Sequence, residues 1–174
     1  GDASSLTTTS SFGKTSDAII RMLGSAYFSA GTYDFSVTAD DGFRVYIDGN
    51  LVINQYNQTS TTTVNNTNSP ITLSQGFHTV EIVYWDQGGS ANFSMKYQEH
   101  DTDNWIQFNS TNVPLFQDDK TPVLNELQDI VKDVSSGNWV IRTGVSHSAG
   151  EGSDIISGSD GKDIIHGNGG DDQI

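Results

Sequence analysis

Asp40 and Asp41 are adjacent carboxylates that close an apolar run and stand directly before Gly42. In a regular strand, consecutive side chains point to opposite faces, so the backbone must leave strand geometry if both carboxylates serve one site. Without a cation between them, the two charges repel each other. Carboxylate oxygens are ligands that Ca²⁺ prefers. The pair therefore predicts a calcium site at the end of a strand.

A second set of aspartates, Asp154, Asp163 and Asp172, recurs with a nine-residue period. The surrounding residues match the repeat Gly-Gly-x-Gly-x-Asp-x-apolar-x of RTX proteins, which binds Ca²⁺ in parallel β-rolls. Each copy makes half a coil, so an ion lies between copies that are one coil apart. Asp154 and Asp172 are predicted to share one ion, whereas Asp163 needs a further copy. The alternative for so short a repeat is a disordered acidic tail.

Residues 1–117 show the period of half-buried strands, with apolar and polar side chains alternating. The alternation is found at 33–39, 43–47, 71–73, 80–84 and 93–97, and turn signals such as Asp48-Gly49 separate these runs. Short strands at this spacing predict an all-β fold, a β-sandwich. The Thr- and Asn-rich segment 57–69 is expected to be a surface loop or an edge hairpin.

Two segments have apolar residues at helical spacing. The first contains Ile19, Ile20 and Leu23 and predicts a short helix over residues 15–24. The second begins with a proline at the first helical position and carries an apolar stripe over residues 122–134. We expect it to form a short helical connector, 118–148, between a β domain, 1–117, and a C-terminal fragment of parallel β-roll repeats, 149–174.

The chain has 174 residues, of which 22 are acidic and 8 are basic, for a formal net charge of −14. This charge argues against nucleic acid and anionic membranes as partners, and no apolar run approaches the length of a membrane span. The sequence has no cysteine, which excludes a disulfide framework and a thiolate metal site. Because Ile174 falls inside a repeat, we expect a fragment of a longer protein.

The segments 31–53 and 76–84, with the Gly88-Gly89 loop, resemble the PA14 family in order and spacing. The resemblance covers roughly residues 1–110 and implies a β-sandwich. PA14 modules occur in adhesins, glycosidases, fungal lectins and toxins, so the family alone does not fix the function.

In the lectin branch of this family, a cis peptide bond joins two aspartates, and a second loop supplies an amide side chain. The resemblance implies that Asp40 and Asp41 are this pair and that the second loop is 86–90. Gln87 is the implied amide ligand, and Asp86 competes with it for this place. Backbone carbonyls of the rest of the loop assist, namely those of Gly88, Gly89 and Ser90.

This ligand set leaves two of the roughly 6–8 coordination positions of Ca²⁺ open, and vicinal hydroxyls of a sugar can fill them. Asp40, Asp41 and Gln87 are therefore also the expected sugar contacts. Trp85 is a candidate for stacking on the sugar ring, with Tyr56 and Trp105 as alternatives.

We therefore expect a calcium-dependent lectin module of a secreted RTX adhesin, carried to the bacterial cell surface by type I secretion. Its expected partners are cell-surface glycans or monosaccharides with vicinal hydroxyls, and a monomer is the default. The alternatives are a peptide-binding, protein-binding or calcium-stiffened spacer module, and an accessory sugar-binding domain of a glycosidase. We expect no catalytic residue, because adjacent carboxylates that flank no cleft make a poor acid/base pair and no histidine has metal-ligand spacing.

Overall fold

The computed structural model describes residues 18–57, 59–88, 91–117 and 120–173. The chain divides into two compact units, Gly1–Thr121 and Pro122–Ile174. The expected start of the connector, residue 118, lies close to this division.

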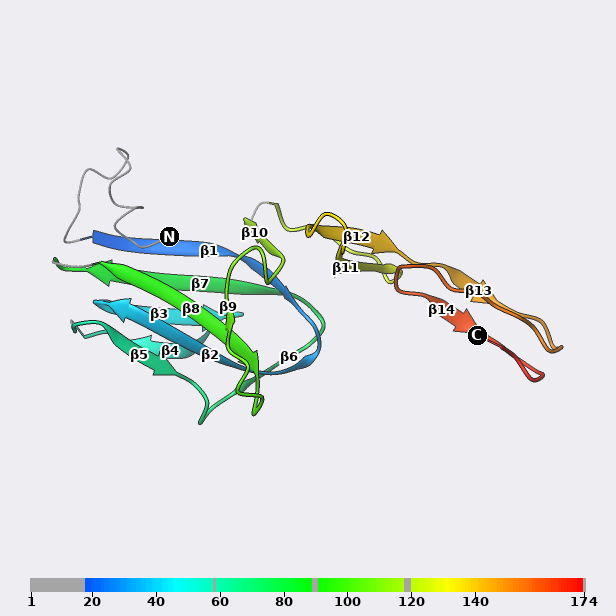
Figure 1. Cartoon of the computed structure of the whole chain (residues 1–174), viewed down its shortest axis with the longest axis horizontal. Helices are drawn as coiled ribbons and strands as arrows, with labels where there is room; N and C mark the ends of the chain where they lie inside the picture. The colour runs from blue at the N-terminus through cyan, green and yellow to red at the C-terminus, as the bar shows by residue number, and fades with distance from the viewer. Residues whose placement is uncertain (1–17, 58, 89–90, 118–119, 174) are drawn as a thin grey trace. The chain divides into compact units, whose positions relative to one another are not determined.

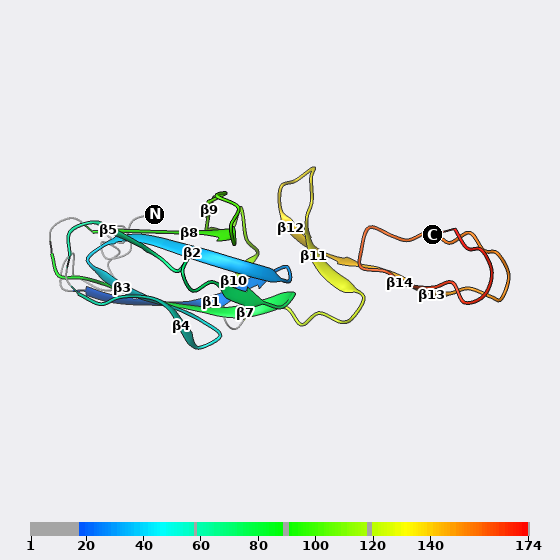
Figure 2. The same cartoon turned by 90° about the horizontal axis from the view of Figure 1, so that it is seen from below.

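The first unit is the predicted β-sandwich, with two antiparallel sheets in separate layers (Figures 1 and 2). One sheet has the order β10-β1-β7-β3-β4, formed by Leu115–Gln117, Ala18–Phe28, Gly76–Asp86, Gly42–Ile47 and Asn50–Gln55. The other has the order β5-β2-β8-β9, formed by Thr62–Asn65, Gly31–Asp40, Asn92–Glu99 and Ile106–Gln107, and β6, Ile71–Leu73, also pairs with β2. The Thr-rich segment 57–69 thus supplies the edge strand β5.

The core between the sheets is formed by the alternate residues that the sequence pattern indicated. Phe35 and Val37 from β2, Phe43 and Val45 from β3, and Tyr84 from β7 are all fully buried. The polar residues between them face outward, for example in the hydroxyl pair Thr38 and Thr63 on β2 and β5. Burial of these large apolar side chains is the main force that holds the two sheets together.

The short helix expected over residues 15–24 is wrong for the part that the structure describes. Residues 18–24 belong to β1, which pairs with β7 from Ala18↔Asp86 to Phe28↔Gly76, whereas residues 15–17 lie outside the described ranges. Ile20 and Met22 pack against the core, but Ile19 is 76% exposed. The apolar residues therefore follow the two-residue period of a strand, and pairing along the whole of β7 overrides the helical spacing.

The prediction of a helical connector is also wrong, because residues 122–134 form no helix. β11, Gln128–Lys132, and β12, Trp139–Thr143, make an antiparallel hairpin with Ile130 opposite Ile141. Val134, which belonged to the expected apolar stripe, is fully exposed. β-Branched residues such as Ile130 and Val131 fit a strand better than a helix, and β12 provides the partner strand.

The turn of this hairpin is closed by the carboxylate of Asp133. Its Oδ1 accepts hydrogen bonds from the main-chain N–H groups of Ser135 and Ser136 and from both serine hydroxyls. Its Oδ2 accepts from Arg142 Nη2 at 2.9 Å. Gly137 takes the positive φ of 70° that the turn requires.

The rest of the second unit contains the predicted parallel β-roll. β13, Ser146–Ser148, pairs in parallel with β14, Ile164–His166, and Ile155 forms a parallel bridge with Gln173. Each partner is 18 residues from the other, which is two nine-residue copies and hence one full coil. Ile156 is buried inside the roll, as expected for the apolar position of the repeat.

Within the described ranges, no helix is long and apolar enough to cross a membrane.

Candidate functional site

The Asp40–Asp41 pair lies where the chain passes from one sheet of the sandwich to the other. Asp40 is the last residue of β2, and Gly42 begins β3 in the opposite sheet. The peptide bond between the two aspartates is cis, as the lectin resemblance implies. Asp41 is only 3% exposed, whereas Asp40 is half-buried.

The structure brings the second predicted loop against this junction. The main-chain N–H of Gln87 donates to Oδ2 of Asp41 at 2.8 Å. Gln87 and Gly88 are exposed, whereas Asp86, the competing ligand, is 2% exposed at the end of β7. Gly89 and Ser90 lie outside the described residues. The aspartate pair and the start of the second loop therefore lie next to each other in the structure.

Tyr84 lies beneath the junction, and the sequence analysis did not assign it to the site. Its buried hydroxyl donates to the main-chain carbonyl of Asp40. Burial, and after it the negative charges of Asp86, Asp40 and Asp41, raise the pKa of Tyr84. Three carboxylates thus act on one buried phenol, and this negative field is what a bound cation would neutralise.

The donor set at the junction fits Ca²⁺ only if oxygens other than carboxylates complete it. Among the residues described, no three His, Asp or Glu side chains are close enough to hold a metal ion by themselves. Asp40 and Asp41 would supply two carboxylates, and the other oxygens would have to come from the exposed Gln87–Gly88 segment, whose Gln87 N–H bonds to Asp41. Such mixed oxygen sites are typical of Ca²⁺.

Two further polar residues border Asp40. Thr61 Oγ1 donates to Oδ2 of Asp40 at 3.2 Å, and Asn92 Nδ2 donates to Thr61 Oγ1 at 3.1 Å. Asn92 also faces Asp40 directly in the β2–β8 register. The sequence analysis did not assign Asn92 to this site. Its position just after the second loop is the one feature of the sequence that indicates a place near Asp40.

The three candidate stacking aromatics lie in different places. Trp85 faces Gly42, and a Cβ atom on Gly42 would approach the indole ring to 2.1 Å, so the ring lies directly over the glycine. Tyr56 is 57% exposed, and its ring faces the guanidinium of Arg44 at 5.8 Å. Trp105 borders a polar groove on the outer face of β2, β5 and β8. Of the three, Trp85 is next to the aspartate pair in the β-sheet register.

Two histidines and the Asp48-Gly49 turn make structural contacts. His78 Nδ1 lies 2.6 Å from Asp48 Oδ2, and His78 Nε2 lies 2.9 Å from the carbonyl of Ser74. Asp48 and Gly49 form the predicted turn with φ of 50° and 76°. His100 Nδ1 contacts the buried carboxylate of Asp34 at 3.0 Å.

In the roll, each repeat aspartate accepts hydrogen bonds from the main chain. Asp163 accepts from the N–H of Val145 at 2.8 Å and from the N–H of Ser159 at 2.7 Å, and the Val145 bond is the largest factor that holds the pKa of Asp163 below its ordinary value. Asp172 accepts from the N–H of Asp154 at 3.0 Å.

The Val145–Asp163 and Asp154–Asp172 hydrogen bonds each join residues 18 positions apart, which is one full coil. Val145 therefore lies one coil before Asp163, just as Asp154 lies one coil before Asp172. The first coil therefore includes residues 144–148, upstream of residue 149 where the prediction began the repeats. The side of the roll with Asp163 has a valine where the other side has a second carboxylate.

The fold and the site define a β-sandwich with an acidic junction, followed by calcium-type β-roll repeats. The chain belongs to the PA14 domain family, whose model matches residues 5–107. Residues 148–174 match the RTX calcium-binding nonapeptide repeat. A PA14 domain followed by RTX repeats is the arrangement that the sequence analysis expected.

Two solved structures are similar to this chain in sequence and fold. The PA14 domain of the antifreeze protein MpAFP has 31% identity and a TM-score of 0.53 over 61% of this chain. A PA14 sugar-binding domain from an RTX adhesin has 35% identity and a TM-score of 0.50 over 59% of this chain. The alignment covers 55% of each of these two solved chains.

An anti-sigma factor domain-containing protein, at 18% identity and a TM-score of 0.51, shares the fold, with 72% of this chain and 44% of that chain aligned. The comparison with curated proteins gave no match.

Proposed function

We propose that this chain is a calcium-dependent carbohydrate-binding module that attaches a secreted adhesin to cell-surface glycans. The observation that carries the proposal is the hydrogen bond from the Gln87 N–H to Asp41, which joins the acidic junction to the second loop. The sugar-binding domain of the RTX adhesin, at 35% identity, supports a carbohydrate as the ligand.

In this proposal, the Ca²⁺ ion binds to Asp40, Asp41 and the second loop, with Gln87 as the amide ligand. The ion would leave two positions open for vicinal hydroxyls of a sugar, because Ca²⁺ takes about 6–8 oxygens. Asp41 is held by the Gln87 N–H through Oδ2, which leaves Oδ1 for the ion. Trp85, whose ring covers Gly42 beside the pair, is the candidate for contact with the sugar ring.

The RTX repeats give calcium a second role in this proposal. The roll buries little apolar surface, and Ile156 is the one buried isoleucine among the residues of the roll that the structure describes. Binding of Ca²⁺ to the folded roll alone would stabilise it by mass action. A protein exported unfolded by type I secretion would then fold on meeting extracellular calcium.

The experiment that tests the function is a glycan-array screen of this chain in millimolar calcium and, in parallel, with a chelator. Circular dichroism in both conditions checks that the sandwich is folded. We expect binding to glycans with accessible vicinal hydroxyls and its loss with the chelator. A folded protein that binds no glycan in either condition would contradict the proposal and favour a peptide-binding or spacer module. Binding that persists with the chelator would contradict the calcium mechanism.

A further inference from the structure

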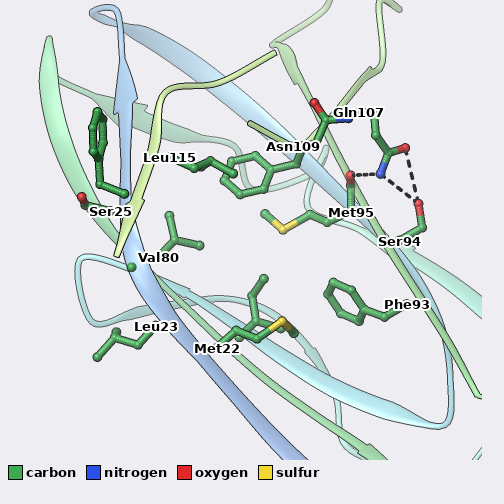
Figure 3. Close-up of a pocket in the computed structure, with 14 residues that line it drawn as sticks. Met22, Leu23, Ser25, Val80, Phe93, Ser94, Met95, Gln107, Asn109 and Leu115 are labelled. Carbon is green, nitrogen blue, oxygen red and sulfur yellow. Dashed lines mark hydrogen bonds between the residues drawn. The ribbon is translucent and has the colours of Figure 1, made fainter. Parts of the chain in front are cut away.

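A cavity of about 520 Å³ lies between the two sheets of the sandwich, at the edge where β1 faces β8 and β9. The two-residue strand β9 and the segment that follows it contribute Gln107, Phe108 and Asn109 to its lining. Figure 3 shows side chains from both sheets around an open space, among them Met22, Val80, Phe93 and Leu115.

The interior of this cavity is largely apolar, and none of the described residues that line it is charged. Its polar lining residues largely bond within the protein. Gln107 Nε2 donates to Ser94 Oγ at 3.2 Å and to the carbonyl of Met95 at 2.9 Å. Asn109 Oδ1 accepts from the N–H groups of Thr111 and Asn112. The cavity therefore offers apolar contact and little hydrogen bonding, which is unsuited to a sugar or an ion.

The two methionines of the chain, Met22 and Met95, both line this cavity, and they come from opposite sheets. Methionine is flexible and polarisable, so it adapts its shape to different apolar ligands. One methionine from each sheet therefore lines the cavity, and the two side chains can adjust their rotamers to contact a bound molecule from both sides. Such a wall differs from the aromatic packing of the neighbouring core, where Phe28 contacts Phe35 and Tyr97.

The size of the cavity argues for an occupant. Protein interiors contain few voids larger than a water molecule. Apolar cavities of about 150 Å³ stay dry and take benzene, and ligand pockets measure roughly 300–1,000 Å³. This cavity, which is partly open to solvent, has a volume of about 520 Å³ and falls in the range of ligand pockets.

We infer that this cavity binds a neutral apolar small molecule, such as the alkyl chain of an uncharged amphiphile. The site lies inside the sandwich and is independent of the calcium and sugar site that we propose at Asp40 and Asp41. Phe93, which lines the cavity, also contacts Tyr84 with ring centroids 5.7 Å apart, so Phe93 and Tyr84 form the wall between the two sites.

The test uses the whole chain labelled with ¹³C at the methionine methyl groups, which gives two NMR signals, both from the cavity. Met22→Leu and Met95→Leu assign them. We titrate 1-octanol, and octanoate separately, each in calcium and in chelator. We expect saturable shifts of both methyl signals with 1-octanol in both conditions, and binding at least about tenfold weaker with octanoate, because no described lining residue carries a positive charge to pair with its carboxylate.

Two filling variants and a matched control complete the test. Val80→Phe and Leu115→Phe place a ring in the cavity, and each should abolish the 1-octanol shifts. Val83→Phe adds the same ring on the outward-facing side of β7 and should leave them unchanged. The second filling variant keeps the test valid if the first does not fold.

Three outcomes would overturn the inference. One is the absence of any saturable shift with 1-octanol. Another is binding that survives both folded filling variants. The third is binding that occurs only after residues 1–17 are deleted, since the chain itself would then be the occupant. Loss of calcium-dependent glycan binding with retained 1-octanol binding would contradict only the proposed function.

Discussion

The main-chain N–H of Gln87 donates to the carboxylate of Asp41 although 46 residues separate them in the sequence. The bond links the junction between the sheets to the loop that follows β7. Asp41 is buried whereas Gln87 is exposed, so the bond is partly shielded from water. Asp41 therefore has two roles in the proposed site: it holds the second loop in place, and it supplies an oxygen for the ion.

Asp41→Asn is expected to remove calcium-dependent glycan binding. The asparagine has the same shape but lacks the charge, and we expect the affinity for calcium to fall at least about 100-fold, the upper range for loss of a group around a metal. Isothermal titration with calcium measures the change. Asp103→Asn is the matched control, because it removes an equal charge at an exposed residue whose φ of 53° asparagine tolerates. Equal calcium affinity in the two variants would refute the site assignment.

Gly42→Ala is expected to destabilise the sandwich, because the new methyl group would lie 2.1 Å from an atom of the Trp85 ring. Displacement of the ring should cost about 1–3 kcal/mol, the usual range for overpacking. Urea unfolding followed by tryptophan fluorescence gives the free energy of unfolding. Gly152→Ala is the control, since no atom lies within 4 Å of its added Cβ. A Gly42→Ala protein as stable as the unmodified chain would show that Trp85 does not cover Gly42.

The hairpin of β11 and β12 is expected to open in acid. Hydrogen bonds from Ser135 and then Ser136 hold the pKa of Asp133 well below its ordinary value. A lowered pKa in the folded state gives stability that is fully present above the ordinary value of about 3.9 and is lost as the pH falls through the lowered one. Amide NMR signals of residues 135–137, followed from pH 6 to pH 2, should therefore change below about pH 4.

Two variants isolate the contribution of Asp133 from that of the other acidic groups. Asp133→Asn keeps one acceptor oxygen for the turn and should abolish the pH dependence of these signals in this window. Asp133→Ala removes the acceptor and should disorder the turn already at pH 6. Signals that depend on pH in the same way in all three proteins would contradict the assignment to Asp133.

The two sides of the roll are expected to respond differently to calcium. Asp154 and Asp172 lie one coil apart, whereas Asp163 has Val145 in the corresponding place. Asp172→Asn should therefore abolish the protection from hydrogen exchange that calcium gives to residues 144–173. Asp163→Asn should weaken protection with and without calcium, because the new amide N–H₂ faces main-chain donors, but it should leave the calcium response. The reverse pattern would contradict the proposed sharing of the ion.

Two geometric features at the aspartate pair could be predicted from the sequence, namely the cis bond and the nearby loop. Adjacent carboxylates before Gly42 indicated a strand end, and the PA14 resemblance implied the second loop and the cis bond. Tyr84 could not be assigned, because an aromatic residue on the buried face of a strand has the pattern of any core residue. Its role at Asp40 follows only from the packing of β7 against the junction.

Both expected helices failed for the same reason: apolar residues three and four apart also fit a strand when some of them face solvent. In β1, Ile19 and Leu23 are exposed and Ile20 and Met22 face inward. In β11, the deciding contact is the pairing with β12, Trp139–Thr143. The prediction of a helix did not take the strand-forming residues of that segment into account. Pairing between segments distant in sequence decides such cases, and a local pattern does not contain it.

The contacts between neighbouring coils join residues 18 positions apart, so the repeats depend on a fixed spacing along the chain. Loss of one residue between Ile155 and Lys162 would place Asp163 out of line with Val145 and Asp172 out of line with Asp154. Insertion of nine residues would instead move each later copy to the opposite side of the roll while keeping its contacts possible. Changes of length within such tails should therefore be tolerated as whole copies and not as single residues.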